Sequence, residues 1–411
     1  MGSRMGCLAV LSVFLLAGCA APGKALKGGY DMPYPPSGPP KAEEIYHVPT
    51  GLNLSFDGMM DMLAGARLIC IGETHDNIHA HRVELLVIRE LFRRYPGKIA
   101  IGMEMFREPD QGNLDRWTKG ELTEREFLKA TKWYENWGSD FGYYRDILAF
   151  AKENGIDVIA LNPPPELQQE VSRTGLDNLA ASVKAKLPEI GEPDPYQKAV
   201  MKGVYGGHLP TEGMFESFFR VQLLWEETMA VRIVDYLGSP RGAGKRMVTI
   251  TGGWHVRYGF GIPKKVVRRM PMTYGIVEPE EISIPEEKKD QIMKVDLPQV
   301  PLHPADFVWM VPYEGLEGKQ VAMGVRLAGG KDNEVIVEGV TPGSPAEKAG
   351  ILKGDRIFSF DGRIVSDVTD VFLNVREKKA WDKATVVVRR DGAEKSVEVE
   401  FFPLPGKKPH E

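Results

Sequence analysis

The feature that most constrains the fold is an apolar run that stops on a glycine and then supplies an acid and a histidine. Residues 68–71 (Leu-Ile-Cys-Ile) form the run, and residues 72–75 (Gly-Glu-Thr-His) follow it, the glycine being expected to let the backbone turn. A second copy occupies residues 247–251 and ends in residues 252–255 (Gly-Gly-Trp-His). Such runs predict buried strands, and open α/β sheets place their ligands just past the carboxyl ends of strands. The repeated Gly-x-x-His element therefore predicts one site shared by two strand ends.

Strand-like and helix-like segments alternate from residue 46 to residue 285. Strands are predicted at 66–71, 98–103, 157–161 and 246–251, and helices at 77–95, 143–154 and 221–236. This alternation predicts a mostly parallel sheet covered by helices. The expected fold class is α/β, a mostly parallel sheet flanked by helices and followed by a small β-rich domain. The polar, helical segment 165–213 is expected to be an insertion or a lid.

Polar side chains at the predicted strand ends are the candidate catalytic and metal-binding residues: Glu73, His75, Glu104 and His255. Asn162 leaves a neighbouring strand in the same way. Two carboxylates and two imidazoles at one sheet edge suit a divalent metal ion, or a general acid/base pair whose pKa values are pushed apart by burial. For the two acids an alternative is a helix N-terminal position, which the helix dipole favours.

Other polar residues lie near these elements. His79 lies four residues after His75 and is expected to support the site from behind it, whereas His81 is expected to be solvated. A stripe at helical spacings of three and four contains Gln222, Trp225, Glu226 and Met229. A structural role is preferred for Trp225 and Met229, and the roles of Gln222 and Glu226 stay open.

The N-terminus has the pattern of an export signal. Arg4 precedes an apolar run at residues 7–16, and small residues then lead to Cys19. The segment resembles a bacterial lipoprotein signal, which implies a signal peptide at 1–18 and lipidation of Cys19; an ordinary secretory signal cut near Ala21 is the alternative. The lipid would anchor the protein to the bacterial cell envelope, with the outer membrane favoured because Ala20, not aspartate, follows the cysteine. Residues 19–45, rich in proline and glycine, are expected to be a tether.

Charge and cysteine content exclude some classes of function. The chain has 411 residues and a formal net charge of −5, with its basic residues dispersed, so no nucleic-acid partner is expected. The only cysteines are Cys7, Cys19 and Cys70, which rules out a cysteine-based zinc site. Cys70 lies inside the first apolar run and is expected to be a small buried hydrophobe.

Several motifs between residues 46 and 285 together resemble the ChaN family of iron-regulated, haem-binding bacterial lipoproteins. They are Gly72 to Asn77, Gly102 to Phe106, Ala160 to Asn162, Gln222 to Ala230, Gly252 to Val256 and Gly259 to Pro263. The resemblance implies haem binding associated with homodimerisation, with a tyrosine as axial ligand. The candidate ligands are Tyr144, Tyr258 and Tyr205, with Tyr143 as a fourth. The superfamily also contains Tiki-type metalloproteases and erythromycin-esterase-like hydrolases.

The C-terminal quarter resembles a bacterial PDZ domain. Residues 286–318 are expected to be a linker, 319–402 the PDZ domain and 403–411 a tail. The motifs are Gly343 to Ile351, Gly354 to Ile357 and Asp361-Gly362. PDZ domains bind an extended peptide as an added strand and hold its terminal carboxylate with backbone amides. The candidate peptide-binding residues are Met323, Gly324, Val325, Val371 and Phe372.

Two functions follow as hypotheses. The first is an envelope-anchored haem- or iron-binding lipoprotein that acts in haem or iron uptake, with a PDZ module that binds a C-terminal peptide or an envelope protein. The second is a metal-dependent hydrolase, peptidase or esterase-like, that uses Glu73, His75, Glu104 and His255, and whose PDZ domain presents peptides.

Overall fold

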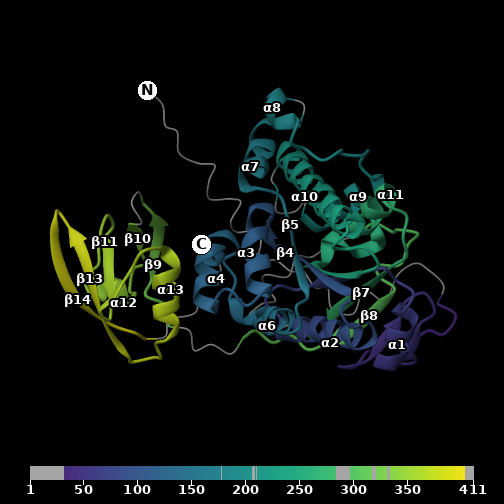
Figure 1. The fold of residues 1–411 in the computed structure, drawn as a ribbon, viewed down its shortest axis with the longest axis horizontal. Helices are drawn as coiled ribbons and strands as arrows, with labels where there is room; N and C mark the ends of the chain where they lie inside the picture. The colour runs from purple at the N-terminus through teal and green to yellow at the C-terminus, as the bar shows by residue number, and fades with distance from the viewer. Residues whose placement is uncertain are drawn as a thin grey trace. The chain divides into compact units, whose positions relative to one another are not determined.

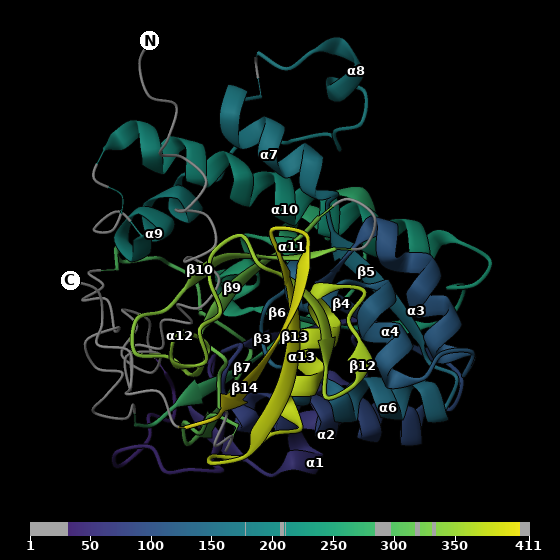
Figure 2. The ribbon, with the colours of Figure 1, turned by 90° about the vertical axis from the view of Figure 1, so that its left-hand side faces the viewer.

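The computed structural model describes residues 32–176, 178–205, 209, 211–283, 297–316, 321–330 and 334–402. The predicted signal peptide, the predicted lipidation site Cys19 and the C-terminal tail lie outside these residues. The chain divides into two compact units, drawn in Figures 1 and 2. The first comprises residues up to 121 together with 141–316, and the second comprises residues 122–140 together with those from 317 onward. Within the described residues, no helix is both long and apolar enough to cross a bilayer.

An eight-stranded sheet forms the centre of the first unit, with the strand order β2-β1-β8-β7-β3-β6-β4-β5. Its six parallel strands are β3 (Leu68–Glu73), β4 (Ile99–Arg107), β5 (Asp157–Asn162), β6 (Arg246–Gly252), β7 (Tyr274–Glu281) and β8 (Phe307–Val311). The central strands β3, β6 and β4 are adjacent, so their carboxyl ends meet at one edge. The prediction of a mostly parallel α/β sheet is confirmed.

Part of the segment 286–318, which was expected to be a linker, belongs to this sheet. Strand β8 lies within that segment and pairs in parallel with β7. Two short strands, β1 (Ile45–His47) and β2 (Leu52–Leu54), then complete the sheet in antiparallel fashion. The run Phe-Val-Trp-Met-Val of β8 is buried along its whole length, which is the pattern of an interior strand and not of a solvated linker.

Helix α2 (Ile78–Arg94) begins and ends where the sequence predicts. The Asn77 side chain caps the helix by accepting a hydrogen bond of 3.0 Å from the His79 amide. Arg93 and Arg94 lie in the last turn, where cations complement the helix dipole. The connection from β3 to α2 is thus only a few residues long, which holds the residues after Glu73 close to the sheet edge.

Helices cover both faces of the sheet (Figures 1 and 2). On one face lie α10 (Glu212–Gly238) and α11 (Ile262–Arg269); on the other lie α2 and α6 (Arg145–Glu153). Leu68 and Cys70 of β3 join the apolar cluster under α10 and α11. Because strand side chains alternate between faces, Glu73 of the same strand points to the opposite face, toward α2.

Further elements complete the first unit. They are α1 (Phe56–Leu63), η2 (Glu108–Asp110), α3 (Gln111–Thr118), η3 (Phe141–Tyr143), α7 (Pro165–Thr174), α8 (Ala181–Lys184), α9 (Pro195–Tyr205), η5 (Gly253–His255) and η6 (Arg257–Gly259). The segment expected as an insertion or lid therefore supplies α7, α8 and α9. Leu167 and Val171 of α7 pack with Val221 and Leu224 of α10.

The second unit has a sheet with the order β14-β13-β11-β10-β9 and with β12 paired to β11. The strands are β9 (Val325–Gly329), β10 (Val335–Val340), β11 (Arg356–Phe360), β12 (Arg363–Ile364), β13 (Lys383–Arg390) and β14 (Ala393–Glu400). The helices are α12 (Pro345–Lys348) and α13 (Val368–Arg376), together with α4 (Glu124–Ala130) and α5 (Trp133–Asn136) from residues 122–140. The β-rich second domain is as predicted; the contribution of α4 and α5 to it is not.

Candidate functional site

The carboxyl ends of β3, β4 and β6 carry the predicted polar residues. Glu73 is the last residue of β3 and is in register with Gly252 at the end of β6. His255 closes the short turn η5 directly after β6, and Glu104 lies in β4 beyond its last pairing with β6 at Met103. The structure therefore brings the strand-end residues to one edge of the sheet, as the sequence predicts.

Strand alternation separates the two acids. Glu73 faces α2, whereas Glu104 faces α10, on the same side as Ala100 of its own strand. His75 lies between them: its Nδ1 is 2.5 Å from Glu73 Oε1, and Glu104 contributes to its charge environment from the other side. The edge thus holds two carboxylate–imidazole clusters, one on each face, with His75 next to both.

The cluster on the α2 face contains Glu73, His75, His81 and Tyr144. The Tyr144 hydroxyl donates a hydrogen bond of 2.8 Å to Glu73 Oε1, and His81 Nδ1 lies 3.1 Å from Glu73 Oε2. Burial alone would raise the pKa of Glu73, but the positive charges of His81 and His75 lower it well below its usual range. Glu73 is therefore a carboxylate held ionised in an apolar interior.

Glu84 also belongs to this cluster. It is fully buried, and its Oε2 is 3.0 Å from His81 Nδ1. Burial and the negative charge of Glu73 raise the pKa of Glu84 well above its usual value. Burial opposes protonation of His81, but Glu73 and Glu84 together raise its pKa to about 10. The prediction that His81 is solvated is wrong, because the side chain is only 5% exposed and lies between the two carboxylates.

The cluster on the α10 face is built around His255. Its Nε2 is 3.5 Å from Glu104 Oε1, its Nδ1 is 3.5 Å from Glu226 Oε1, and Gln222 Nε2 is 2.9 Å from the same Nδ1. Burial opposes protonation, but Glu104 and Glu226 raise the pKa of His255 to about 10. Gln222 and Glu226, whose roles the sequence leaves open, are thus part of the site.

A buried lysine completes this second cluster. Lys265 Nζ of α11 lies 2.7 Å from Glu226 Oε2. Gln197 of α9 donates a hydrogen bond of 2.7 Å to the same oxygen. Burial would raise the pKa of Glu226, but Lys265 and His255 lower it to about 2. The chain Glu104, His255, Glu226, Lys265 alternates in charge, which fixes the orientation of the His255 ring.

The glycines of the two Gly-x-x-His elements are required because neighbouring side chains and backbone lie very close to them, and not because the chain makes a left-handed turn. Gly72 lies within β3, and a Cβ added there would stand 2.3 Å from Glu278 Oε1 and 2.8 Å from the Gly253 Cα. A Cβ on Gly252 would stand 3.2 Å from His75 Nε2, and the Gly252 amide donates a hydrogen bond of 2.8 Å to Glu104 Oε2. Both glycines therefore leave space for polar side chains.

Strand β7 adds buried acids to the same edge. Glu278 and Glu280 both pair with Arg257, whose Nε lies 3.2 Å from Glu278 Oε2. Burial is the main cause that raises the pKa of Glu278 to about 8, while Arg257 opposes this rise. Glu281 accepts a hydrogen bond of 3.0 Å from Asn77 Nδ2, which ties β7 to the N-terminus of α2.

The remaining predicted residues lie at the margin. Asn162 donates a hydrogen bond of 2.6 Å to the Glu104 carbonyl oxygen, and His79 is 2.9 Å from the partly exposed Glu314. Among the described residues, the group whose possible ligand atoms lie within 4.8 Å of one another is Glu73, His81 and Glu84. This group shares only Glu73 with the predicted metal ligands.

The tyrosines named as haem ligands differ in accessibility. Tyr144 is fully buried and bound to Glu73, whereas Tyr205 and Tyr258 are half-buried. Tyr205 and Tyr258 pack, together with Trp254, against a cluster of Val200, Val204 and Phe260. Tyr143 accepts a hydrogen bond of 3.0 Å from the Leu316 amide.

In the second unit, the predicted peptide-binding residues flank strand β9 and helix α13. Strand β9 is the last strand in the order of the sheet, paired on one side with β10. Gly324 has a φ of +78°, and a Cβ there would be 2.2 Å from Cβ of Ser344. Met323 and Val371 are buried in the core of this unit, whereas Phe372 is 42% exposed. Val371 therefore packs α13 onto the core of this unit, and Phe372 is the exposed side chain of the pair.

Helices α4 and α5 pack on α13. The Tyr134 ring stacks on Phe372 with centroids 5.0 Å apart. Lys129 Nζ lies 2.8 Å from Asp370 Oδ2, and Arg125 contacts the other oxygen at 2.5 Å. Burial would raise the pKa of Asp370, but Lys129, Ser366 and Arg125 lower it to about 2.

Comparison with known proteins identifies both units. The family of haem-binding uptake proteins of the ChaN type, in the Tiki superfamily, matches residues 59–266, slightly more than half of the chain. The chain belongs to this family. A PDZ domain matches residues 321–401. The ChaN-family match includes both Gly-x-x-His elements and both carboxylate–imidazole clusters.

The fold of the ChaN-family unit has a solved counterpart. The structure described as cofacial haem binding to ChaN of Campylobacter jejuni is 16% identical in sequence, with a TM-score of 0.51. That match covers 68% of this chain and 100% of the other. At this identity the likeness establishes a shared fold.

Two curated relatives match over short segments. A probable periplasmic DegP-like serine endoprotease of Marinomonas sp. (strain MWYL1) is 36% identical over 69 residues, which is 17% of this chain and 15% of that protein. A putative zinc metalloprotease of Brucella suis biovar 1 (strain 1330) is 36% identical over 77 residues, 19% of this chain and 20% of that protein. This chain therefore matches at most a fifth of the length of these relatives.

Proposed function

We propose that this protein is an envelope-anchored, haem- or iron-binding lipoprotein that acts in haem or iron uptake and carries a peptide-binding PDZ module. The observation that carries the proposal is the family match across residues 59–266, because the family is one of haem-binding uptake proteins. The lipoprotein-like N-terminus, with Cys19 as the residue to be acylated, supports the envelope location. Replacement of Cys19 by serine should abolish palmitate incorporation in cells; undiminished labelling would contradict the anchor.

The donor set around Tyr205 and Tyr258 fits haem. Both phenol groups are partly exposed, and they stand beside the aromatic rings of Trp254, Phe260 and Phe218, which offer an apolar surface for a porphyrin. When bound, haem would take a phenolate oxygen as its axial ligand. Tyr144 is a poorer candidate, because ligation would break its hydrogen bond to Glu73 and expose a fully buried side chain.

Haem titration of conservative variants tests this assignment. Tyr205→Phe and Tyr258→Phe each remove one hydroxyl while keeping the ring, and Tyr144→Phe is the matched control. The axial ligand should be the residue whose variant loses the tyrosinate charge-transfer band and shifts the Soret maximum. If Tyr144→Phe alone removes the band, the assignment to the Tyr205/Tyr258 surface is wrong.

Dimerisation with haem is a further part of the proposal. The Campylobacter jejuni relative is described as binding haem cofacially, an arrangement in which two haems face each other. A partly exposed aromatic surface such as that of Tyr205 and Tyr258 could stack in this way against a second copy. Light scattering should show the molar mass of the lipid-free protein doubling when haem is added. A mass that stays monomeric at saturating haem would contradict this.

The PDZ domain is proposed to bind the C-terminus of an envelope protein. Strand β9 is the edge to which a peptide strand would add, with the Met323-Gly324-Val325 loop at the carboxylate end. Exposed Phe372 would contact the peptide side chains. Phe372→Ala should weaken binding of a selected C-terminal peptide, whereas amidation of the peptide carboxylate should abolish it; equal affinity for the amidated peptide would refute this mode.

The alternative function is a metal-dependent hydrolase. It is favoured by the convergence of Glu73, His75, Glu104 and His255 at one sheet edge, where His75 lies next to both acids. His75 or His255 would move a proton, and the carboxylates would orient the rings. Peptidase and esterase activity of the purified protein should fall to background in His75→Gln and in His255→Gln. Activity that survives in both variants would eliminate this function.

A further inference from the structure

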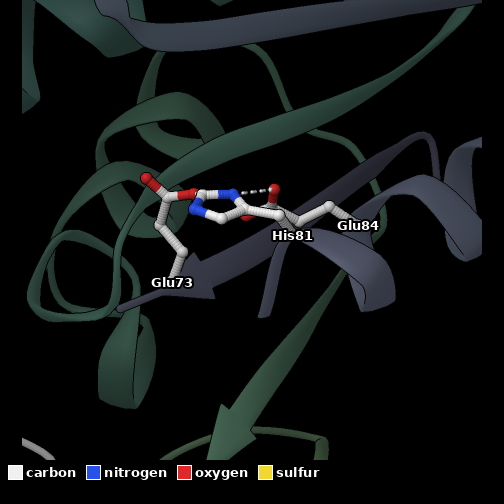
Figure 3. A group of neighbouring side chains, drawn as sticks. All are labelled: Glu73, His81 and Glu84. Carbon is white, nitrogen blue, oxygen red and sulfur yellow. Dashed lines mark hydrogen bonds and ion pairs between the residues drawn. The ribbon is translucent and has the colours of Figure 1, made fainter. Parts of the chain in front are cut away.

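Three buried side chains on β3 and α2 have the composition of a cation site. Glu73 ends β3, while His81 and Glu84 lie one turn apart on the same side of α2. Figure 3 shows the His81 ring between the two carboxylates. Glu73 and His81 are each 5% exposed, and Glu84 is fully buried. One donor atom from each residue lies within 4.8 Å of the other two.

The tautomer of His81 is fixed by the backbone. His81 Nε2 is 3.2 Å from the carbonyl oxygen of His75, and a carbonyl can only accept. Nε2 therefore carries a hydrogen. In the neutral ring the lone pair then belongs to Nδ1, which faces Glu84 Oε2 at 3.0 Å and Glu73 Oε2 at 3.1 Å. A carbonyl that orients the second nitrogen in this way is typical of histidines that ligate metal ions.

Two carboxylate oxygens in the cluster lack hydrogen-bond donors. Glu73 Oε1 is occupied by the Tyr144 hydroxyl and by His75 Nδ1, whereas Oε2 of Glu73 has beside it only His81 Nδ1, at 3.1 Å, which can donate only when the ring is protonated. Oε1 of Glu84 accepts no hydrogen bond. Each of these atoms is buried, and a buried polar atom without a hydrogen-bond partner is unfavourable. Such atoms indicate that the cluster is built to hold a positive group.

We propose that Glu73, His81 and Glu84 bind a divalent first-row transition-metal ion, with the Nδ1 atom of His81 and one oxygen of each carboxylate as ligands. Two carboxylates balance the charge of a divalent ion, and mixed imidazole and carboxylate ligands suit zinc, manganese and iron. Bonds of about 2.0–2.2 Å in a tetrahedral arrangement separate ligand atoms by about 3.3 Å. The present N···O spacings of 3.0 and 3.1 Å need to widen by only a few tenths of an ångström.

The surroundings would protect such an ion. The rings of Tyr143 and Tyr144 pack against His81 with centroids 5.2 and 4.6 Å away. They exclude water from one side of the cluster and hold the imidazole plane. The competing occupant is a proton on Nδ1, which would make His81 an imidazolium clamped between the two glutamates. The proposal does not rest on haem binding, and its ligands differ from the proposed hydrolase set except for Glu73.

Zinc binding distinguishes the ion from the proton. The metal-free full-length protein is titrated with Zn²⁺ by calorimetry, and the zinc retained after dialysis is measured by mass spectrometry. The wild type is expected to bind one Zn²⁺ per chain, and Glu84→Gln and His81→Gln to lose at least tenfold in affinity. His47→Gln is the control, because His47 belongs to the same unit but lies outside both clusters, with its Nδ1 2.9 Å from Thr50 Oγ1; it should bind like the wild type.

Several outcomes overturn the proposal. One is a wild type that binds no Zn²⁺, which would assign the cluster to a proton. Another is loss of zinc in His255→Gln with retention in Glu84→Gln, which would place the ion on the α10 face. Because Glu84→Gln could fail to fold, X-ray absorption at the zinc edge of the wild type provides a second test. It must show one imidazole and carboxylate oxygens, and a shell of two or more imidazoles refutes the site.

Discussion

Replacement of Gly72 by alanine should destabilise the ChaN-family unit strongly, although glycine to alanine is usually a mild change inside a strand. The added Cβ would meet Glu278 Oε1 at 2.3 Å, the Glu278 Cδ at 2.7 Å and the Gly253 Cα at 2.8 Å. The first two contacts could be relieved only by moving a buried carboxylate away from Arg257. The third is with the backbone of the turn that carries His255, so a side-chain rotation cannot remove it.

The magnitude follows from these contacts. Overpacking of a well-packed interior costs about 1–3 kcal/mol. Loss of the contact between Glu278 and Arg257 costs about 1–3 kcal/mol, as for a buried hydrogen bond, because a pKa of about 8 leaves Glu278 mostly protonated at neutral pH. Alanine lowers the conformational entropy of the unfolded chain, which stabilises the folded state by about 0.4–1 kcal/mol. The net loss of unfolding free energy should therefore be about 1–5 kcal/mol.

Differential scanning calorimetry measures this effect. For a unit of this size, about 1 kcal/mol shifts the melting temperature by about 2–4 °C, so the transition of the ChaN-family unit should fall by at least about 2 °C. Gly65→Ala is the matched control: a Cβ at Gly65 would meet nothing within 4 Å, and the change should stay within about 0.5 kcal/mol. If Gly72→Ala and Gly65→Ala have the same melting temperature, the steric account of the Gly-x-x-His glycine is wrong.

Three further predictions concern the buried charges and the PDZ helix. Glu226→Gln should lower the pKa of His255 from about 10 by about 1–3 units, as NMR titration of the imidazole would show; an unchanged value would remove Glu226 as a cause. Because the pKa of His255 is raised on folding, its stabilising effect should be complete below about pH 6.5 and disappear as the pH rises through 10, which urea unfolding across this range would detect. Asp370→Asn should cost about 1–3 kcal/mol and speed hydrogen exchange in α13, since it weakens the contacts of Lys129 and Arg125; unaltered exchange would contradict their role.

The sequence predicts the main sheet and most of the strand-end residues for a definite reason. Apolar runs such as 68–71 and 247–251 are long enough to specify buried strands, and parallel strands necessarily bring their carboxyl ends together. Glu73 and His255 could therefore be placed at one edge without coordinates. The division of Glu73 and Glu104 between the two faces also follows from strand alternation, once it is known that α10 covers one face and α2 the other.

The helical partners could not be predicted in the same way. His81 is predicted to be solvated on the polar side of the helix, and Glu84 is not singled out by the sequence. Only the packing of α2 over the end of β3 shows that both are buried. The role of Glu226 could not be predicted for the same reason, because its partner Lys265 lies 39 residues later in the chain. Long-range pairs of this kind leave no local periodicity.

The boundary between the two units could not be predicted from the sequence either. Residues 122–140 lie inside the ChaN-family segment of the sequence, yet α4 and α5 belong with the PDZ unit. Their link is a few specific contacts, such as Tyr134 on Phe372 and Lys129 with Asp370, and not an apolar run. Strand β8 was missed because five residues between prolines give too short a pattern to distinguish a strand from a linker.

The most direct test of the central claim is a haem titration of the lipid-free protein followed by its Soret absorbance. Haem binding predicts a saturable shift of the Soret band with a defined stoichiometry, together with a tyrosinate charge-transfer band that is lost in Tyr205→Phe or Tyr258→Phe. A spectrum that remains the sum of free haem and protein at every ratio would contradict the claim that this ChaN-family protein binds haem.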